Sequence, residues 1–245
     1  MPIPGADPHE VVEYVVDGDE LVGAGGFLKL RRLHLRNRRA DGTLSRGYIS
    51  DSVARPYGQD AVIVAIYARH GDGDGDGIDA IDVLVRDQLR PAVSFGRDAS
   101  VAPLPEAPAG MFATELVAGI LETSDHGEVG LRARAAAETF EEAGFVVDPA
   151  AILLLGGGTY PSPGSMVEKF YFTAVEVDPQ AQQPLGGDGS PMEEGARTRW
   201  MPFAAAIAAC TSGALPDLKT EVGLRRLRDH LERREPAATA MRPGH

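Results

Sequence analysis

The chain has 245 residues, 43% of them hydrophobic and 24% charged, so it can bury a substantial core. Its formal net charge of −12 argues against broad nucleic-acid binding, because non-specific affinity for phosphate backbones rises with the number of cations presented. No run reaches the roughly 18 apolar residues that span a bilayer, and residues 1–10 lack a signal-peptide layout, so we expect a soluble cytoplasmic protein. The single cysteine, Cys210, has apolar neighbours and is expected to be a buried structural thiol.

Residues 11–57 carry the pattern of a small antiparallel sheet. Over residues 27–35 leucines alternate with polar residues except for one slip at Arg31-Arg32, which predicts a strand with a bulge. Asp41-Gly42 predicts a hairpin turn into a second short strand over residues 44–49. The region also holds a cluster of cations in an otherwise acidic chain: Lys29, Arg31, Arg32, Arg36, Arg38, Arg39 and Arg46.

Two apolar runs, residues 61–67 and 81–85, predict paired strands of a central sheet. Between them, aspartates alternate with glycines over residues 71–77, as in a calcium loop of the EF-hand type. The last position of such a loop should be a bidentate glutamate, but it is Val83, and neither flank predicts a helix. We therefore favour a flexible hairpin tip, with calcium binding as the alternative.

An alanine-rich stretch over residues 129–143 predicts a helix that Gly144 ends. Trp200 is interpreted as core or hinge packing, with ligand stacking as the alternative. The remaining elements are extended segments at 145–147, 152–155 and 170–175 and helices at 204–210 and 219–233.

The alanine-rich helix carries three carboxylates, Glu138, Glu141 and Glu142, within one turn of one another. Without a counter-charge, each like-charged pair costs about 0.2 to 0.5 kcal/mol, and more where solvent is excluded. A bound cation reverses that sign, and oxygen-only ligands suit Mg²⁺ or Mn²⁺. The alternative, which the helix alone favours, is an exposed acidic face that pairs with nearby arginines.

In its wider context this stretch resembles the second half of the Nudix box. Glu138, Glu141, Glu142, Gly144 and Phe145 match the pattern. Three further segments resemble the ADP-ribose pyrophosphatases and their nucleotide-sugar relatives in the expected order: Glu115 to Gly119, Ser162-Pro163-Gly164 followed by Glu168, and Glu193-Glu194. Several motifs in order are more specific than one box, and the similarity runs from about Leu28 to Leu231.

The resemblance implies an α/β fold, namely a Nudix α/β/α sandwich with a mixed sheet, preceded by a small antiparallel N-terminal element. Residues 1–57 would form that element, residues 58–233 the hydrolase domain and residues 234–245 a flexible tail. It also implies a homodimer to which the N-terminal sheet lends cations, although solvated strand faces explain most of the basic cluster.

The resemblance further implies the site residues. Glu138, Glu141, Glu142 and the backbone carbonyl of Ala118 would hold Mg²⁺, or Mn²⁺, and Glu194 or else Glu193 would act as general base. The residues expected at the substrate are Arg90, Glu115, Ser162, Gly164 and Glu168. For Arg90 a surface salt bridge is an equal alternative, and Ser162 to Gly164 would be an ordinary turn if it stood alone. The leading substrate is ADP-ribose, cut to AMP and ribose 5-phosphate, followed by other nucleoside diphosphate sugars.

The box also departs from the family pattern. Ala137 stands where the family has an arginine that pairs with an earlier glutamate, Thr139 stands at an apolar position, and the spacing around Glu128 is longer. Arg134, one turn before Glu138, is positioned to take over part of the orienting role. The competing hypothesis is a Nudix-fold binding module that senses a nucleotide sugar without cutting it, and Ala137 is its main support.

Overall fold

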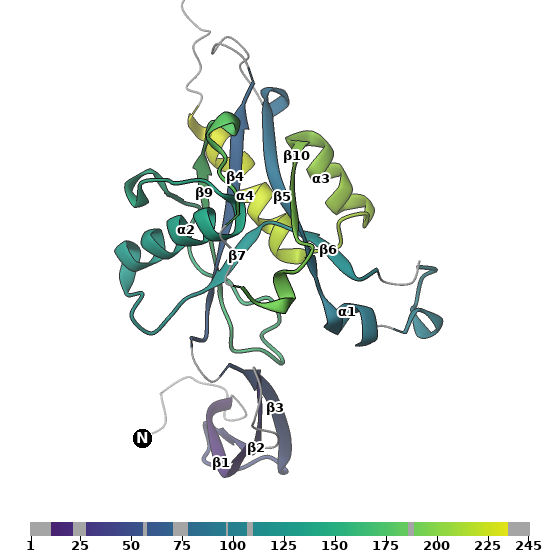
Figure 1. The fold of residues 1–245 in the computed structure, drawn as a ribbon. Helices are drawn as coiled ribbons and strands as arrows, with labels where there is room; N and C mark the ends of the chain where they lie inside the picture. The colour runs from purple at the N-terminus through teal and green to yellow at the C-terminus, as the bar shows by residue number, and fades with distance from the viewer. Residues whose placement is uncertain are drawn as a thin grey trace, which may run out of the picture. The chain divides into compact units, whose positions relative to one another are not determined.

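The computed structural model describes residues 11–21, 28–55, 58–70, 78–96, 98–106, 110–185 and 189–234. The chain divides into two compact units (Figure 1). The first contains strands β1 (Val11–Leu21), β2 (Lys29–Arg39) and β3 (Tyr48–Ala54) together with residues 160–169. The second contains the remaining strands and the helices.

The first unit is built on a three-stranded antiparallel sheet in the order β1-β2-β3. The hairpin turn expected at Asp41-Gly42 is confirmed, because Gly42 has a φ of 84° and the Asp41 carboxylate accepts from the Thr43 amide at 2.8 Å. The strand expected to start at residue 44 starts only at Tyr48, since Leu44 forms no more than an isolated bridge with Arg38.

The prediction of a bulge at Arg31-Arg32 is wrong. The register of β2 against β3 is unbroken from Lys29↔Ala54 to Leu35↔Tyr48, and the shifts lie in β1 at Val11/Glu13 and Val16/Gly18. Most of β2 is half-buried on both faces, so no strict inside-outside alternation is imposed and a slip in the leucine pattern needs no extra residue.

Three arginines of the basic cluster are neutralised within this sheet. Their ion pairs with aspartates of neighbouring strands are Arg31–Asp19 at 2.6 Å, Arg32–Asp51 at 2.7 Å and Arg36–Asp17 at 2.5 Å. All six side chains are about a third to a half exposed, so the pairs set cross-strand register more than they add stability. For these three cations the structure agrees with a solvated strand face.

Residues 160–169 join the first unit through β3. The Val53 amide donates to the Ser165 carbonyl at 2.8 Å, and Val53 forms a parallel bridge with Met166. Arg55 pairs with the buried Glu168 at 2.7 Å. Residues 160–169 therefore pack with the N-terminal sheet.

The second unit is built on a mixed sheet with the strand order β10-β5-β4-β9-β8, in which β6 also pairs with β5 and β7 with β4. Among the strands that the structure describes in this unit, β4 and β9 pair in parallel and the other pairs are antiparallel. The strands are β4 (Ala61–Arg69), β5 (Ile81–Leu89), β6 (Phe112–Glu115), β7 (Val117–Ile120), β8 (Leu153–Leu154), β9 (Phe170–Glu176) and β10 (Arg197–Pro202).

Helices cover both faces of this sheet (Figure 1). They are α2 (Gly127–Ala143) on one face and α3 (Phe203–Ser212) and α4 (Leu218–Arg234) on the other, whereas the short helix α1 (Pro91–Gly96) has no buried residue. The continuous apolar run of β4 explains the layering, because Ile63 and Ala65 pack in a core cluster with α3 and α4, and Val62 and Val64 pack in one with α2. The expected α/β/α sandwich with a mixed sheet and a preceding antiparallel element is confirmed.

Several local expectations are resolved in the same unit. Cys210 is buried, and Trp200 packs edge-on against the buried Phe145 with ring centroids 6.1 Å apart, so both core assignments are confirmed. Residues 145–147 form no strand, because Phe145 turns into the core directly after the helix. The repeat at 71–77 and the tail from 235 lie outside the described residues. Among the described residues, none of the helices combines the length and the apolar character required to cross a bilayer.

Candidate active site

Helix α2 presents two of its three clustered carboxylates to the sheet. Glu138 and Glu142 are only 9% and 7% exposed, and they share the buried face with Ala135 and Thr139. Glu141 is half-buried. The small alanine side chains let the helix lie close to the strands, and Gly144 ends it in the left-handed conformation with a φ of 76°. The alternative interpretation, in which these carboxylates lie on an exposed acidic face of the helix, is therefore excluded for Glu138 and Glu142.

Glu138 lies directly against the backbone of β7 at Gly119. A Cβ added to Gly119 would fall 1.9 Å from both Cδ and Oε1 of Glu138. Real atoms never approach so closely, so the carboxylate occupies the space that any side chain at this position would need. The glycine of the Glu115–Gly119 segment is thus explained by the glutamate opposite it.

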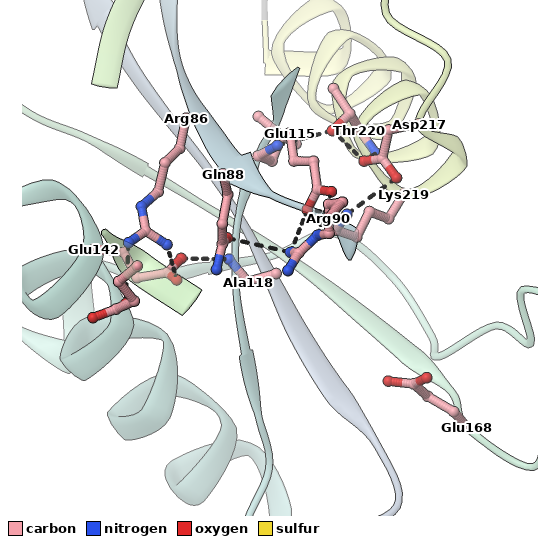
Figure 2. A network of polar contacts seen from close by, with 12 residues as sticks. Arg86, Gln88, Arg90, Glu115, Ala118, Glu142, Glu168, Asp217, Lys219 and Thr220 are labelled. Atoms are coloured by element: carbon pink, nitrogen blue, oxygen red, sulfur yellow. Dashed lines mark hydrogen bonds and ion pairs between the residues drawn. The ribbon is translucent and has the colours of Figure 1, made fainter. Parts of the chain in front are cut away.

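Glu142 is held by two donors from different strands (Figure 2). Its Oε2 accepts from the backbone amide of Ala118 at 3.2 Å, and its Oε1 pairs with Nη1 of Arg86. Ala118 was expected to contribute its carbonyl, whereas the contact that the structure shows is made by its amide. Either way, β7 and α2 meet at this residue.

Arg86 is a site residue that the sequence reasoning missed. It lies in β5, its side chain is 3% exposed, and its Nη2 pairs with Glu193 at 3.0 Å. Nε is buried and has no hydrogen-bond partner in the described part of the chain. A charged residue directly after the buried run Val83–Val85 was the available signal. Arg86 follows Leu84 by two positions and therefore points to the same face of the sheet, toward α2.

The two glutamates of the acidic loop are placed differently. Glu193, at the end of the short helix η5 (Pro191–Glu193), reaches the site through Arg86. Glu194 is exposed. Glu193 therefore contacts the cluster through Arg86, whereas the side chain of Glu194 is open to solvent.

Burial and mutual repulsion make this cluster electrostatically costly. Burial, followed by the charges of Glu142 and Glu141, raises the pKa of Glu138 to about 8. Burial also raises the pKa of Glu142, although the Arg86 charge and the Ala118 amide oppose the shift. A cation among these oxygens would remove the cost.

The donor chemistry of the cluster fits magnesium or manganese. Glu138 and Glu142 offer buried carboxylate oxygens, which hard divalent cations prefer. As arranged, however, the described residues contain no group of three or more acidic, histidine or cysteine side chains disposed around one ion position. The Arg86 guanidinium, placed between Glu142 and Glu193, is the cation that stands there instead.

Arg134 braces the start of α2 to the preceding loop. Its Nε bonds Asp125 at 2.9 Å and its Nη2 pairs with Glu122 at 2.8 Å, whereas Nη1 is 4.0 Å from Glu138. The expected orienting role therefore takes a different form. Arg134 fixes the loop between β7 and α2 and contributes to Glu138 mainly through its charge.

A second polar network surrounds Glu115 at the end of β6 (Figure 2). Glu115 accepts from Nε and Nη2 of Arg90 at 2.7 and 2.6 Å and from Nζ of Lys219 at 2.6 Å. Lys219 also bonds Asp217, whose carboxylate caps α4 by accepting from the Thr220 amide at 3.0 Å. No sequence pattern links Lys219 or Asp217 to Glu115, because both are far from it along the chain.

This network keeps Glu115 ionised and Arg90 in place. Burial on its own would raise the pKa of Glu115, but the Arg90 hydrogen bonds and the Lys219 charge outweigh it and lower the pKa. Arg90 uses Nε and Nη2 in this pair, and among the described residues its Nη1 has no partner. The guanidinium is thus fixed while one donor remains available.

The other expected substrate residues belong to the first unit. Ser162 and Ser165 share a hydroxyl hydrogen bond of 2.9 Å, and the Met166 amide donates to the Ser162 carbonyl, so Ser162 to Gly164 forms a tight turn. Glu168 pairs with Arg55 in that unit. Contacts within the first unit therefore position these residues.

Comparison with known proteins places the fold. No family model and no curated protein matches the sequence. A solved structure described as an ADP compounds hydrolase superposes with a TM-score of 0.60 at 11% identity, over 92% of this chain and 97% of that one. The T. brucei MERS1–RNA complex matches 63% of this chain and 55% of its own at 14% identity, but its TM-score of 0.37 is too low to define a common fold. The chain therefore shares the architecture of the ADP compounds hydrolase.

Proposed function

We propose that the chain is a Mg²⁺-dependent hydrolase of the Nudix superfamily that cleaves the diphosphate linkage of a nucleoside diphosphate sugar. The observation that carries the proposal is the burial of Glu138 and Glu142 side by side on α2, against Gly119 and Ala118 of β7. The order of the motifs and the fold shared with an ADP compounds hydrolase support it. ADP-ribose is the leading substrate, and its products would be AMP and ribose 5-phosphate.

Glu138 and Glu142, with Glu141 and the carbonyl of Ala118, are the residues that would hold the ion. When bound, a divalent ion neutralises phosphate charge and lowers the pKa of a water molecule. The protein's contribution is to fix these oxygens in advance. Glu138 is confined by the β7 backbone and Glu142 is oriented by the Ala118 amide, so little side-chain entropy remains to be lost.

Two further groups would act on the substrate. Glu194 would accept the proton of the attacking water, because its neighbour Glu193 is committed to Arg86. Arg90 would donate to a phosphate oxygen through Nη1, held in position by Glu115. Ser162, Gly164 and Glu168 remain proposed substrate contacts on the strength of the resemblance alone.

The second candidate is a binding module that recognises a nucleotide sugar without cleaving it. Two observations favour it: Ala137 stands in place of an arginine, and Arg86 occupies an oxygen of Glu142. Such a module would bind the same ligands but release no nucleoside monophosphate.

A turnover assay separates the two candidates. The protein is incubated with Mg²⁺ and either ADP-ribose or a panel of other nucleoside diphosphate sugars, and release of nucleoside monophosphate is measured. We expect turnover that Glu142→Gln lowers by orders of magnitude while the circular dichroism spectrum is retained. Glu128→Gln, an exposed glutamate of the same helix, is the matched control and should leave turnover unchanged. Tight binding without product would establish the binding module, and unchanged turnover in Glu142→Gln would remove this residue from the mechanism.

A further inference from the structure

Arg86 forms the most deeply buried ion pairs of the cluster. Its side chain is 3% exposed, and it bridges the side chains of Glu142 and Glu193, which are 9% and 17% exposed. A guanidinium is always charged and binds two carboxylates well because its donors form a rigid fork. In this structure it gives both glutamates a positive partner without any metal ion.

The same arrangement opposes a divalent ion at Glu142. The two oxygens of Glu142 are already committed, Oε1 to Arg86 and Oε2 to the Ala118 amide. A backbone amide is neutral and tolerates a nearby cation, whereas a guanidinium and a divalent ion repel strongly in a buried setting. An ion that takes Oε1 must therefore displace the guanidinium, not merely add to it.

We propose that Arg86 is an internal counter-cation that must leave Glu142 when a divalent ion binds, so that it sets the metal concentration at which the site loads. The inference rests on the proposed function. Two features suit Arg86 to the exchange. Nε has no hydrogen-bond partner among the described residues, so no third bond retains the group, and Glu193 remains as a partner after Glu142 is released.

A purely structural brace would behave in the opposite way. If Arg86 only held α2 and the acidic loop in place, its removal would loosen Glu142 and weaken metal binding. If it competes with the ion, its removal leaves a buried, unpaired carboxylate that binds a divalent ion more tightly. The sign of the change in affinity therefore distinguishes the two roles.

The test measures Mn²⁺ affinity by titration calorimetry and electron paramagnetic resonance, with no substrate present. Arg86→Met should bind Mn²⁺ at least about 10-fold more tightly than wild type, which corresponds to about 1.4 kcal/mol. Arg86→Lys keeps the charge and should stay close to wild type. Arg69→Met removes an exposed arginine that pairs with Glu176 at 3.4 Å, and it should change nothing.

Unchanged or weaker Mn²⁺ binding by Arg86→Met would overturn the inference. An equal increase of Mn²⁺ affinity in Arg86→Lys would also overturn it, because Lys keeps the positive charge and the increase would then come from altered packing. If Arg86→Met is unfolded in chelator, recovery of the folded spectrum on adding Mn²⁺ supports competition, and failure to recover overturns it.

Glu142→Gln separates this inference from the proposed function. If Glu142 binds Mn²⁺ equally in wild type and Arg86→Met, only the counter-cation role fails. If neither protein shows Mn²⁺ binding that depends on Glu142, the proposed function fails as well.

Discussion

Replacing Gly119 by alanine should greatly reduce the activity of the site, although the protein should still fold. The new Cβ would lie 1.9 Å from Cδ and Oε1 of Glu138 and 2.4 Å from its Cγ. These atoms form the far end of a flexible side chain, so the glutamate can move away while the strand stays in place. Relief of the overlap would cost about 1–3 kcal/mol of unfolding free energy, as is usual when a methyl group is forced into a packed region.

The functional loss should be much larger than the structural one. To reach an ordinary contact of about 3.5 Å, the carboxylate of Glu138 has to retreat by roughly 1.5 Å. Metal–ligand distances tolerate only about 0.2 Å, and a displacement of about 1 Å at a reacting centre can cost 100-fold in rate. We therefore expect kcat/KM to fall at least about 100-fold, with weaker Mn²⁺ binding.

The assay compares Gly119→Ala with Gly96→Ala, since a Cβ at Gly96 would meet no atom within 4 Å. Turnover, Mn²⁺ affinity and the urea midpoint are measured for both variants. Gly96→Ala should match wild type in all three. Wild-type turnover and wild-type Mn²⁺ affinity in Gly119→Ala would refute the reasoning, because Glu138 would then have no need of its present position.

Two further predictions concern helix α2. The pKa of Glu138 rises from 4.5 to about 8 on folding, so the folded state retains a proton that the unfolded state loses, and metal-free stability should fall as pH rises through this interval. The measurement is urea unfolding of wild type and Glu138→Gln in the presence of chelator. At pH 9 the free energy of unfolding of Glu138→Gln should exceed that of wild type by at most about 5 kcal/mol, and at pH 5 the difference between the two proteins should be smaller. The same difference at both pH values would contradict this prediction. Arg134→Met should lower the unfolding free energy by about 1–3 kcal/mol, because it loses the hydrogen bond to Asp125 and the ion pair with Glu122. Its control, Arg225→Met, removes an exposed pair with Glu221 and should cost less than about 1 kcal/mol, and an equal loss in both variants would show that Arg134 is no special brace.

Local patterns were enough to predict the elements that position the site. The uninterrupted apolar run of β4 predicts a strand buried on both faces, and the alanine-rich stretch before Gly144 predicts α2. In both, the side chains that decide the structure are neighbours along the chain. The crowding of Glu138 and Glu142 followed from helical spacing in the same way, although spacing alone could not say which face was buried.

The parts that could not be predicted depend on partners far apart in sequence. Arg86 meets Glu142 across 56 residues and Glu193 across 107, and Lys219 meets Glu115 across 104. No periodicity records such pairings, since they arise only when the sheet brings separate strands and helix ends together. The bulge expected at Arg31-Arg32 failed for a related reason, because the register of β2 is set by its neighbouring strands.

The excursion of residues 160–169 into the first unit constrains how the chain can be divided and made. Thr159 and Phe170 bond each other's backbone at 3.0 and 2.8 Å, which closes the base of the excursion in the second unit. A truncation that removed residues up to 59 would strip Met166 and Glu168 of their partners, so the N-terminal sheet is not a detachable module. During synthesis, the three strands of that sheet emerge first, but residues 160–169, which pack with them, emerge only after the ribosome has passed residue 169.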